Sequence, residues 1–596
     1  MFLDGLILVV FYAVLATPIV FLASATQDDL PKLVYLLWGT FLLAALVFLR
    51  NLSLRRWAFP SRPLLLAIAL FAAVRGAGAA FSPSLDAALL DLALLAACVV
   101  VAVLVLLDRP VANFLEQRGL PILVLVGAAV SALGVLQHFG VDLVRGEAER
   151  AAVGTLGNPN FAGALAAALL PLALGLAVAP CERPLRSAML ASAPFLLAEA
   201  VLSGSRGAWL GGVAGLAIFG GFFLFGRVPP QLRQVRRTAA AVAAVFLLVT
   251  LGLGATTEVG KRFRVLFSRE AASREVRPSL WAGAIRMTRD KPWTGHGTGG
   301  FAPAYVAYRD PEEAHLSGNA SQVEEPHCEP LRIAAENGVP GLIASALLLL
   351  AAAAGARHAL ARGTALRPHL VAVGIIASLA SLFVFGLVNP LGSVPSLALV
   401  GWVLLAALGS LRTIPKGETR VYRPSRAGLL ACALPALAGL GGLALYATSL
   451  LRDDMARREA IDSPTNPWKV ERLLRGAAPT DPSARLLLAQ LYSGIAQQVP
   501  GHLEDHVRAA AQARAAVTTC PWDGHAWTRL GECELYCGRP AESEQAFLEA
   551  VRLEPGYAQA RVGLAELYDA TGRSREAEEQ KRLLDETKSR EGVSPR

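Results

Sequence analysis

Charged residues are scarce in this sequence. Only 17% of its 596 residues are Asp, Glu, Lys or Arg, whereas 54% are hydrophobic. A soluble domain carries about 25% charged residues. The deficit excludes an ordinary soluble protein and indicates an integral membrane protein. Aromatic residues are also few, and the apolar segments consist mainly of Ala, Leu, Val and Gly. Small residues let membrane helices approach closely, so we expect a packed bundle.

Clustered cysteines are absent. The seven cysteines are scattered, and none shows a CxxC or Cys/His ligand spacing. This pattern predicts neither a zinc site nor a disulfide scaffold. The first apolar segment, residues 5–24, lacks a basic stretch before it, so we expect a retained helix rather than a cleaved signal peptide.

Long runs of apolar residues make up most of the sequence. A membrane span needs about 20 apolar residues. On that basis the sequence predicts an all-α, polytopic transmembrane bundle of about thirteen spans, near residues 5–24, 33–49, 63–82, 87–107, 120–139, 160–179, 186–203, 207–226, 238–256, 339–356, 369–388, 393–411 and 427–450.

Arginine and lysine are distributed unevenly over the connecting loops. Loops after even-numbered spans are rich in Arg, whereas short loops after odd-numbered spans carry few basic residues. The positive-inside rule then puts the N-terminus in the cytoplasm. The same asymmetry accounts for the net charge of +9, so no nucleic-acid partner is expected.

Two long polar segments both follow odd-numbered spans and should face the outside. We therefore expect four regions: a bundle of nine spans at 1–256, a large periplasmic loop at 257–338, four further spans at 339–450, and a periplasmic domain at 451–596.

The C-terminal region contains a repeat. Four matched pairs of residues lie 34 positions apart: Pro521 and Pro555, Ala526 and Ala560, Leu530 and Leu564, and Gly538 and Gly572. This period is typical of tetratricopeptide helix pairs. Such repeats stack into a concave binding surface, so we expect them to bind a protein partner.

The large loop contains the glycine-rich sequence "GHGTGG" at residues 295–300. No strand is predicted before it and no Lys-Ser/Thr follows, which disfavours a nucleotide-phosphate loop. Glycines that let the chain turn tightly against the membrane surface are the better interpretation.

Several motifs occur in a characteristic order. They are "GTLGNPNFAGALAAALLPL" from Gly154, "LSGSRGAWLGG" from Leu202, an arginine followed by Trp281, "GHGTGGF" with Tyr305 and Tyr308, and "HCEPLRIAAENGVPGLI" from His327. Together, over residues 150–400, they resemble the O-antigen ligase and polymerase superfamily of integral membrane glycosyltransferases. One position departs from that pattern, because Cys328 stands where the family usually has Asn.

The resemblance implies a polyprenyl (undecaprenyl) diphosphate-linked glycan as donor, membrane lipid around the protein, and neither a metal nor another cofactor. It also implies a multi-pass protein of the bacterial inner membrane. The expected activity is glycosyl transfer to an acceptor hydroxyl, with lipid A-core, or otherwise another glycan, as the acceptor.

Arginine suits the diphosphate, because its fork of donors matches phosphate oxygens. We expect Arg206 and Arg277 to hold it. Alternatively, Arg206 only extends its charged group to the membrane interface, and Arg277 is only a solvated charge of the loop, without a role in binding.

His327 is the expected general base, because imidazole accepts a hydroxyl proton near neutral pH. A surface histidine without function is the alternative, since His296, His315 and His369 are also available. Pro330 should begin a helix that Gly338 ends as a C-cap.

Three further residues are expected to bind substrate. Glu336 lies in the last turn before Gly338, where the helix dipole disfavours a carboxylate, although a solvated side chain is an alternative. Arg75 lies inside a span and either contacts the diphosphate or pairs with Asp86 or Asp91. Tyr305 is the third.

Other functions stay open at this level. Within the superfamily, a polymerase of O-antigen or exopolysaccharide and a protein O-oligosaccharyltransferase share these motifs. A transporter of lipid-linked glycans and an envelope assembly scaffold are alternatives of a different class.

The arginine asymmetry generates a prediction about orientation. Alkaline phosphatase fused after residue 596 should be active, because the C-terminal region should lie outside the cytoplasm. A cytoplasmic reporter such as green fluorescent protein, fused at the same position, is the control and should be dark. Fluorescence with inactive phosphatase would contradict the orientation.

Overall fold

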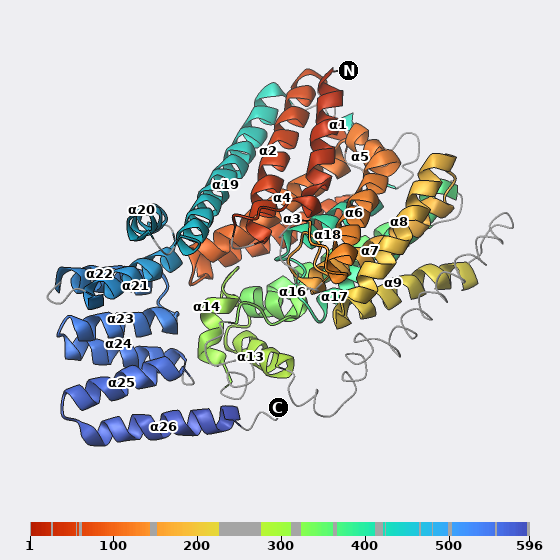
Figure 1. Cartoon of the computed structure of the whole chain (residues 1–596). Helices are drawn as coiled ribbons and strands as arrows, with labels where there is room; N and C mark the ends of the chain where they lie inside the picture. The colour runs from red at the N-terminus through yellow and green to blue at the C-terminus, as the bar shows by residue number, and fades with distance from the viewer. Residues whose placement is uncertain are drawn as a thin grey trace.

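The computed structural model describes residues 2–592 except 26–27, 55–56, 59–61, 144–151, 226–275, 311–322, 361–365, 412–420, 423–424, 464–465, 480, 499–502 and 555–556. Within these residues the chain is almost entirely helical, which confirms the predicted all-α class (Figure 1).

Ten helical segments of the described chain are long and apolar enough to cross a membrane. They are α2 (Asp29–Leu54), α3 (Arg62–Gly78), α4 (Leu85–Leu107), the continuous α5, η3 and α6 (Arg109–Phe114, Leu115–Gly119 and Leu120–His138), α7 (Pro159–Val178), α8 (Arg183–Leu202), α9 (Arg206–Phe225), α16 (Glu329–Ala359), α17 (Leu366–Gly386) and α19 (Arg426–Ile461). Two shorter apolar helices, α1 (Phe2–Leu15) and α18 (Pro395–Ser410), correspond to the first and twelfth predicted spans. The ninth, 238–256, lies outside the described residues.

Small residues set the close packing of the bundle. Helix α7 begins after Asn158, whose side chain accepts a hydrogen bond from the Asn160 amide, and almost every later residue of the helix is buried. At its contact with α17, a Cβ on Gly175 would lie 2.9 Å from the Cα of Gly374. Only glycine permits this approach of two backbones, as expected from an alanine- and glycine-rich membrane protein.

A two-stranded antiparallel ladder is the exception to the helical architecture. Strands β1 (Trp57–Ala58) and β2 (Val421–Tyr422) pair with Trp57 opposite Tyr422. The ladder connects the segment after α2 with the segment before α19.

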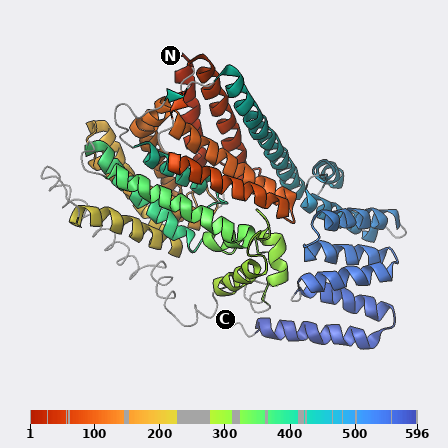
Figure 2. The ribbon, with the colours of Figure 1, turned by 180° about the vertical axis from the view of Figure 1, so that it is seen from behind.

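The predicted outer loop forms a compact unit at one end of the bundle. It comprises α13 (Arg277–Asp290), α14 (Phe301–Tyr305) and η5 (Val306–Tyr308), which lie beside the beginning of α16 in both views (Figures 1 and 2). A small core of its own holds the unit together, formed by Leu280, Ala284, Met287, Phe301, Tyr305 and, from α16, Ala335.

Helix α16 is interrupted at Gly338, where φ is +62°. Pro330 lies in its first turn, as predicted, and Gly338 ends that first helical segment with a positive φ and a ψ of −157°, a combination essentially restricted to glycine. The next amide, Val339 N–H, donates to Pro292 O at 2.7 Å, which ties the interruption to the glycine-rich loop.

The C-terminal region is a stack of helices. Helix α19 passes residue 450, where the sequence placed a boundary, and ends at Ile461. It is followed by α20 (Pro467–Ala477), α21 (Pro482–Gln498), α22 (Leu503–Thr519), α23 (Gly524–Tyr536), α24 (Pro540–Leu553), α25 (Ala558–Ala570) and α26 (Ser574–Gly592). We call α20–α26 the helical array.

The 34-residue period appears in the array. Helices α23 and α25 begin 34 residues apart, as do α24 and α26. Gly538 and Gly572, predicted to be equivalent, have φ of +73° and +76°. The assignment of these helix pairs to the tetratricopeptide family stays a prediction.

The array lies beside the loop unit rather than apart from it (Figures 1 and 2). Tyr446 of α19 donates to Asp86 Oδ1 at the start of α4, at 2.6 Å. Burial raises the pKa of Glu554, which follows α24, and the nearby His525 and Arg309 oppose that rise. Because Arg309 follows η5, this end of α24 is next to the loop unit.

Candidate functional site

A network of buried charges joins three helices. Arg75 of α3 donates from Nη1 to Glu336 Oε2 and to Asn337 Oδ1 of α16, both at 2.6 Å. Its Nη2 pairs with Asp91 of α4. Of the two partners that the sequence left open, the structure therefore selects Asp91, whereas Asp86 binds Tyr446. Arg75 is only 2% exposed, so it faces the bundle interior, as expected of a charge inside a span.

A second arginine, Arg332 of α16, completes the network. Its Nη1 lies 3.2 Å from both Asp91 Oδ1 and Glu336 Oε2, and its Nη2 lies 2.5 Å from Glu329 Oε1. We call Arg75, Asp91, Glu329, Arg332 and Glu336 the charge network. Two guanidinium groups thus neutralise most of the charge of three carboxylates.

The charge network also reaches the segment between α17 and α18. Glu329 Oε2 accepts the amide N–H groups of Leu391 and Gly392, at 3.2 and 3.1 Å. Three transmembrane helices and one connecting segment are therefore held by a single set of buried polar contacts. Buried charges are tolerated only when such partners are complete.

Glu336 is not the solvated side chain that the sequence left as an alternative. It is 2% exposed, and both arginines of the charge network contact its Oε2. A carboxylate in the last helical turn, which the helix dipole disfavours, is thus stabilised by two cations.

The glycine-rich loop is clamped between α3 and α16. Thr298 Oγ1 donates to Arg75 O at 2.6 Å and accepts from Asn337 Nδ2 at 2.9 Å. Gly297 has φ of +91°, and a Cβ there would lie 2.2 Å from the Ser82 nitrogen. The glycines therefore turn the chain tightly against the bundle, as predicted.

The amides of this loop are already bonded. His296 N–H donates to Ala335 O at 2.9 Å, Gly297 N–H to Glu336 O at 2.8 Å, and Thr298 N–H to Gly78 O at 3.2 Å. A phosphate cradle needs such amides free to face a ligand. The loop therefore positions α16 and does not bind a nucleotide phosphate through these groups.

His327 occupies an exposed and conformationally unusual position. Its φ is +50°, and it is the non-glycine residue with positive φ in the described chain. Trp281 Nε1 of α13 donates to the carbonyl of the preceding residue, Pro326, at 3.1 Å. The backbone of His327 is thus positioned by the contact of Pro326 with α13 on one side and by the start of α16 on the other.

The competing histidines are placed differently. His296 is 6% exposed, its Nε2 lies 3.2 Å from Met287 O, and burial lowers the pKa of its imidazole. His369 lies within α17, and His315 lies outside the described residues. Among the described loop histidines, His327 is the one that is accessible to an acceptor.

Cys328, at the position of the family asparagine, is the N-cap residue of α16. Its carbonyl accepts the Arg332 amide at 2.9 Å, but its side chain makes no capping hydrogen bond. The side chain is buried, and burial raises the pKa of its thiol.

The two predicted diphosphate arginines each begin a helix. Arg277 begins α13, one turn before Trp281, so it is joined to the His327 segment through the indole hydrogen bond. Arg206 begins α9, next to Gly207, where a Cβ would lie 2.0 Å from Asn389 Nδ2. Asn389 belongs to the same connecting segment that Glu329 binds. The structure therefore brings the three helix starts that carry Arg206, Arg277 and His327 to one end of the bundle.

Tyr305 lies inside the loop unit. It is 1% exposed, its ring stacks on Phe301 at 5.1 Å between centroids, and it packs against Gly283 of α13. This position fixes α14 to α13 and leaves little of the side chain for a ligand.

Glu325 is a residue that sequence reasoning missed. It precedes His327 by two residues, Ser393 donates a hydrogen bond to its carboxyl, and burial raises its pKa to about 8. No partner in the described chain bonds its buried Oε2. Arg332 was missed as well, although the spacing of Glu329, Arg332 and Glu336 is the helical spacing at which opposite charges meet.

A cavity of about 450 Å³ begins at the charge network. Asp91 and Glu329, with both arginines, form its polar end, and apolar side chains of α3, α4, α16, α17 and α18 form the rest, including Phe71, Leu342, Phe383 and Trp402. We call it the membrane cavity. Its shape and chemistry suit an apolar chain that carries a polar head group. No cluster of His, Cys, Asp and Glu in the described residues is arranged to hold a metal.

Comparison with known proteins identifies part of this region. The family model described as O-antigen ligase matches residues 191–346, which include Arg206, Arg277, His327, the loop unit and the first half of α16. No curated protein matches the chain. The resemblance predicted from the motifs is therefore confirmed by the family model.

The charge network generates a stability prediction. Replacing Arg75 by Met should lower the free energy of unfolding by about 3–5 kcal/mol, because Asp91 and Glu336 lose a buried partner. Thermal unfolding of the detergent-purified protein measures this. Arg289→Met, which removes an exposed arginine of α13, is the matched control. Equal melting temperatures for the two variants would show that the network contributes nothing to stability.

Proposed function

We propose that the protein transfers a glycan from a polyprenyl diphosphate carrier to an acceptor hydroxyl, with lipid A-core as the acceptor. The premise is that residues 191–346 match the family model described as O-antigen ligase. The observation that carries this proposal is the position of His327. His327 is exposed, and it precedes Glu329, which lines the polar end of the membrane cavity, by two residues. The carbonyl of Pro326, the residue before it, accepts a hydrogen bond from Trp281 of α13.

The membrane cavity supports a lipid-linked donor. Its walls are apolar over most of their length, and its polar end lies at the charge network, whose α16 members follow His327 by two to nine residues. A polyprenyl chain would occupy the apolar part and leave its diphosphate at the end where the loop unit covers the bundle. The membrane then holds the donor in one place while the acceptor approaches from the aqueous side.

Arg206 and Arg277 would bind the diphosphate. Each guanidinium group presents several donors in a fixed plane, which matches the oxygens of a phosphate and keeps its charge in a partly dry site. Negative charge grows on the leaving diphosphate as the glycosidic bond breaks, so fixed cations stabilise the transition state more than the ground state.

His327 would act as the general base. Its neutral imidazole accepts the proton of the acceptor hydroxyl while the hydroxyl oxygen attacks the anomeric carbon of the donor glycan. The bond between that carbon and the diphosphate oxygen breaks, and the electron pair leaves with the polyprenyl diphosphate. Atoms and charge balance without a metal or a nucleotide.

The remaining predicted residues would position the residues that contact the substrates. We propose that Arg75 and Glu336 fix the start of α16, and with it His327, and that Tyr305 fixes α14 against α13. Contact of Arg75 with the diphosphate would occur through the edge of its guanidinium that borders the membrane cavity. The loop unit and the array would face the periplasm of a bacterial inner membrane.

Variants of the site should separate donor binding from transfer. His327→Ala should slow transfer by about 100- to 10,000-fold, the usual contribution of general acid–base catalysis, and should leave binding of the polyprenyl diphosphate glycan unchanged. Arg206→Lys and Arg277→Lys should weaken that binding, because lysine keeps the charge and loses the fork. A transfer assay and a parallel binding assay on purified protein measure both effects.

Two surface variants serve as controls for this experiment. His358→Ala removes an exposed histidine at the far end of α16, and Arg289→Lys makes the same change on the exposed face of α13. Transfer by His327→Ala at the rate of His358→Ala would make His327 a structural residue and overturn the mechanism. Product analysis identifies the acceptor, because longer lipid-linked glycan instead of glycan on lipid A-core would indicate a polymerase.

A further inference from the structure

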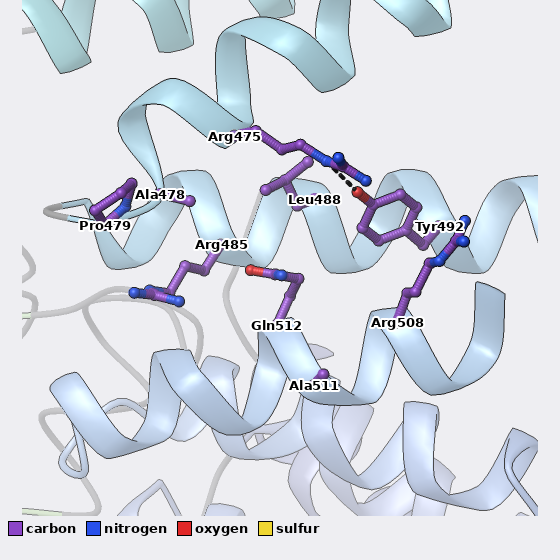
Figure 3. A pocket seen from close by; sticks show the side chains of 9 residues that line it. All are labelled: Arg475, Ala478, Pro479, Arg485, Leu488, Tyr492, Arg508, Ala511 and Gln512. Atoms are coloured by element: carbon purple, nitrogen blue, oxygen red, sulfur yellow. Dashed lines mark hydrogen bonds between the residues drawn. The ribbon is translucent and has the colours of Figure 1, made fainter. Parts of the chain in front are cut away.

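A groove on the helical array lies apart from the site described above. It has a volume of about 430 Å³ and is formed between α20, α21 and α22, by Arg475, Ala478, Pro479, Arg485, Leu488, Tyr492, Arg508, Ala511 and Gln512 (Figure 3). We call it the arginine groove. Three helices each contribute an arginine to it, and its lining includes no acidic side chain.

Two of the arginines are held in place by neighbouring side chains. Arg475 Nε donates to the hydroxyl of Tyr492 at 3.0 Å, and its Nη2 lies 2.7 Å from Glu471 Oε1. Arg508 Nη1 donates to Asp505 Oδ1 at 3.0 Å. A guanidinium group has five N–H donors, so these contacts orient both side chains and leave donors for a ligand.

Arg485 is the least committed cation of the groove. Its side chain makes no hydrogen bond or ion pair to any part of the chain that the structure describes. It lies on α21 seven residues before Tyr492, which corresponds to about 10 Å along a helix. The groove therefore presents cationic donors at two ends, Arg485 at one and Arg475 with Arg508 at the other (Figure 3).

Gln512 supplies a complementary group between the two ends. Its side chain extends from α22 toward α21 (Figure 3). Its Oε1 is buried and has no hydrogen-bond partner among the described residues. A carbonyl oxygen without a donor is unfavourable, so a ligand hydroxyl that reaches this oxygen would form a hydrogen bond that the described chain does not supply.

We propose that the arginine groove binds an acidic segment of a glycan, whose carboxylate or phosphate groups pair with the arginines and whose hydroxyl donates to Gln512. Arginine forks match both kinds of anion, and a glycan carries hydroxyls between its charged groups. Leu488, Pro479 and two alanines give the groove an apolar floor for the ring faces.

The choice of a glycan over an acidic peptide rests on the proposed function and on the position of the array. The array lies beside the loop unit, with Glu554 next to Arg309 and α19 bonded to the start of α4. A glycan that enters or leaves the site would pass along the array. The arginine groove would then retain acidic glycans near the site and select against neutral ones.

Binding of defined oligomers to the full-length, detergent-purified protein tests this proposal. The probe is a hexamer of galacturonic acid, and its affinity is measured by isothermal titration calorimetry. A neutral glucose hexamer and hexaglutamate are the comparison ligands. The expected result is binding of the galacturonate hexamer, at least about tenfold weaker binding of hexaglutamate, and no binding of the glucose hexamer.

Three variants make the assignment specific. Arg485→Gln and Gln512→Leu should each weaken binding of the galacturonate hexamer about tenfold or more, because each removes a contact to the ligand. Arg552→Gln, an exposed arginine on α24, removes the same charge from the array and should leave the affinity unchanged. Equal losses in Arg485→Gln and Arg552→Gln would reduce the effect to overall charge and overturn the proposal.

The other outcomes are also decisive. Hexaglutamate that binds as tightly as the galacturonate hexamer would make the groove a site for acidic peptides, and binding of neither would exclude a ligand of this charge. Since the calorimetric assay measures no transfer, absence of galacturonate binding to the unmodified protein overturns this inference alone. If the unmodified protein bound the galacturonate hexamer but transferred no glycan from the polyprenyl diphosphate donor, the proposed glycosyltransferase activity would be overturned instead.

Discussion

The contact between Arg75 and Glu336 is the interaction on which the site depends. It joins residues 261 positions apart in the chain, and Asp91 and Arg332 extend it to α4 and along α16. A charge in this environment is costly unless it is fully paired. The helices that supply the partners must therefore assemble in one register, and that register also sets where α16 begins. His327 precedes the first residue of α16 by two positions, so the charge network also fixes the backbone that carries its imidazole.

The glycine-rich loop converts that register into a defined surface. Its amides bond the last turn of the first segment of α16, and Thr298 bridges Asn337 to the backbone of Arg75. Residues with a side chain could not enter this space, since a Cβ on Gly297 would meet the backbone at Ser82. The loop unit is consequently attached to the bundle by backbone contacts, and its own apolar core keeps α13 in line with the His327 segment. The helical array lies next to this unit and outside the bundle (Figures 1 and 2).

Much of the fold could be predicted from the sequence. In the hydrocarbon core every backbone polar group needs a hydrogen-bond partner, and long apolar helices supply these partners within one segment. The first turn of α16, which contains Pro330, and the interruption at Gly338 could also be predicted, since local backbone preferences decide them. The partner of Arg75 could not be predicted, because Asp86 and Asp91 both lie on α4 and only the packing of α3 against α4 selects between them. Burial of the Tyr305 side chain and of Glu325 Oε2 depends on how the loop folds onto α16, which no local pattern contains. Helix α19 continues beyond residue 450 because its later residues are polar helix formers. A search for runs of apolar residues does not detect this part of the helix.

The central claim is that a polyprenyl diphosphate enters the membrane cavity and presents its head group to His327, Arg206 and Arg277. The most direct measurement is a cryo-electron microscopy structure of the protein with a polyprenyl diphosphate glycan bound. The account predicts an apolar chain between α3, α16 and α18, a diphosphate against the two arginines, and the first sugar beside the imidazole of His327. A lipid bound at another face of the bundle, with its diphosphate distant from His327, would contradict it.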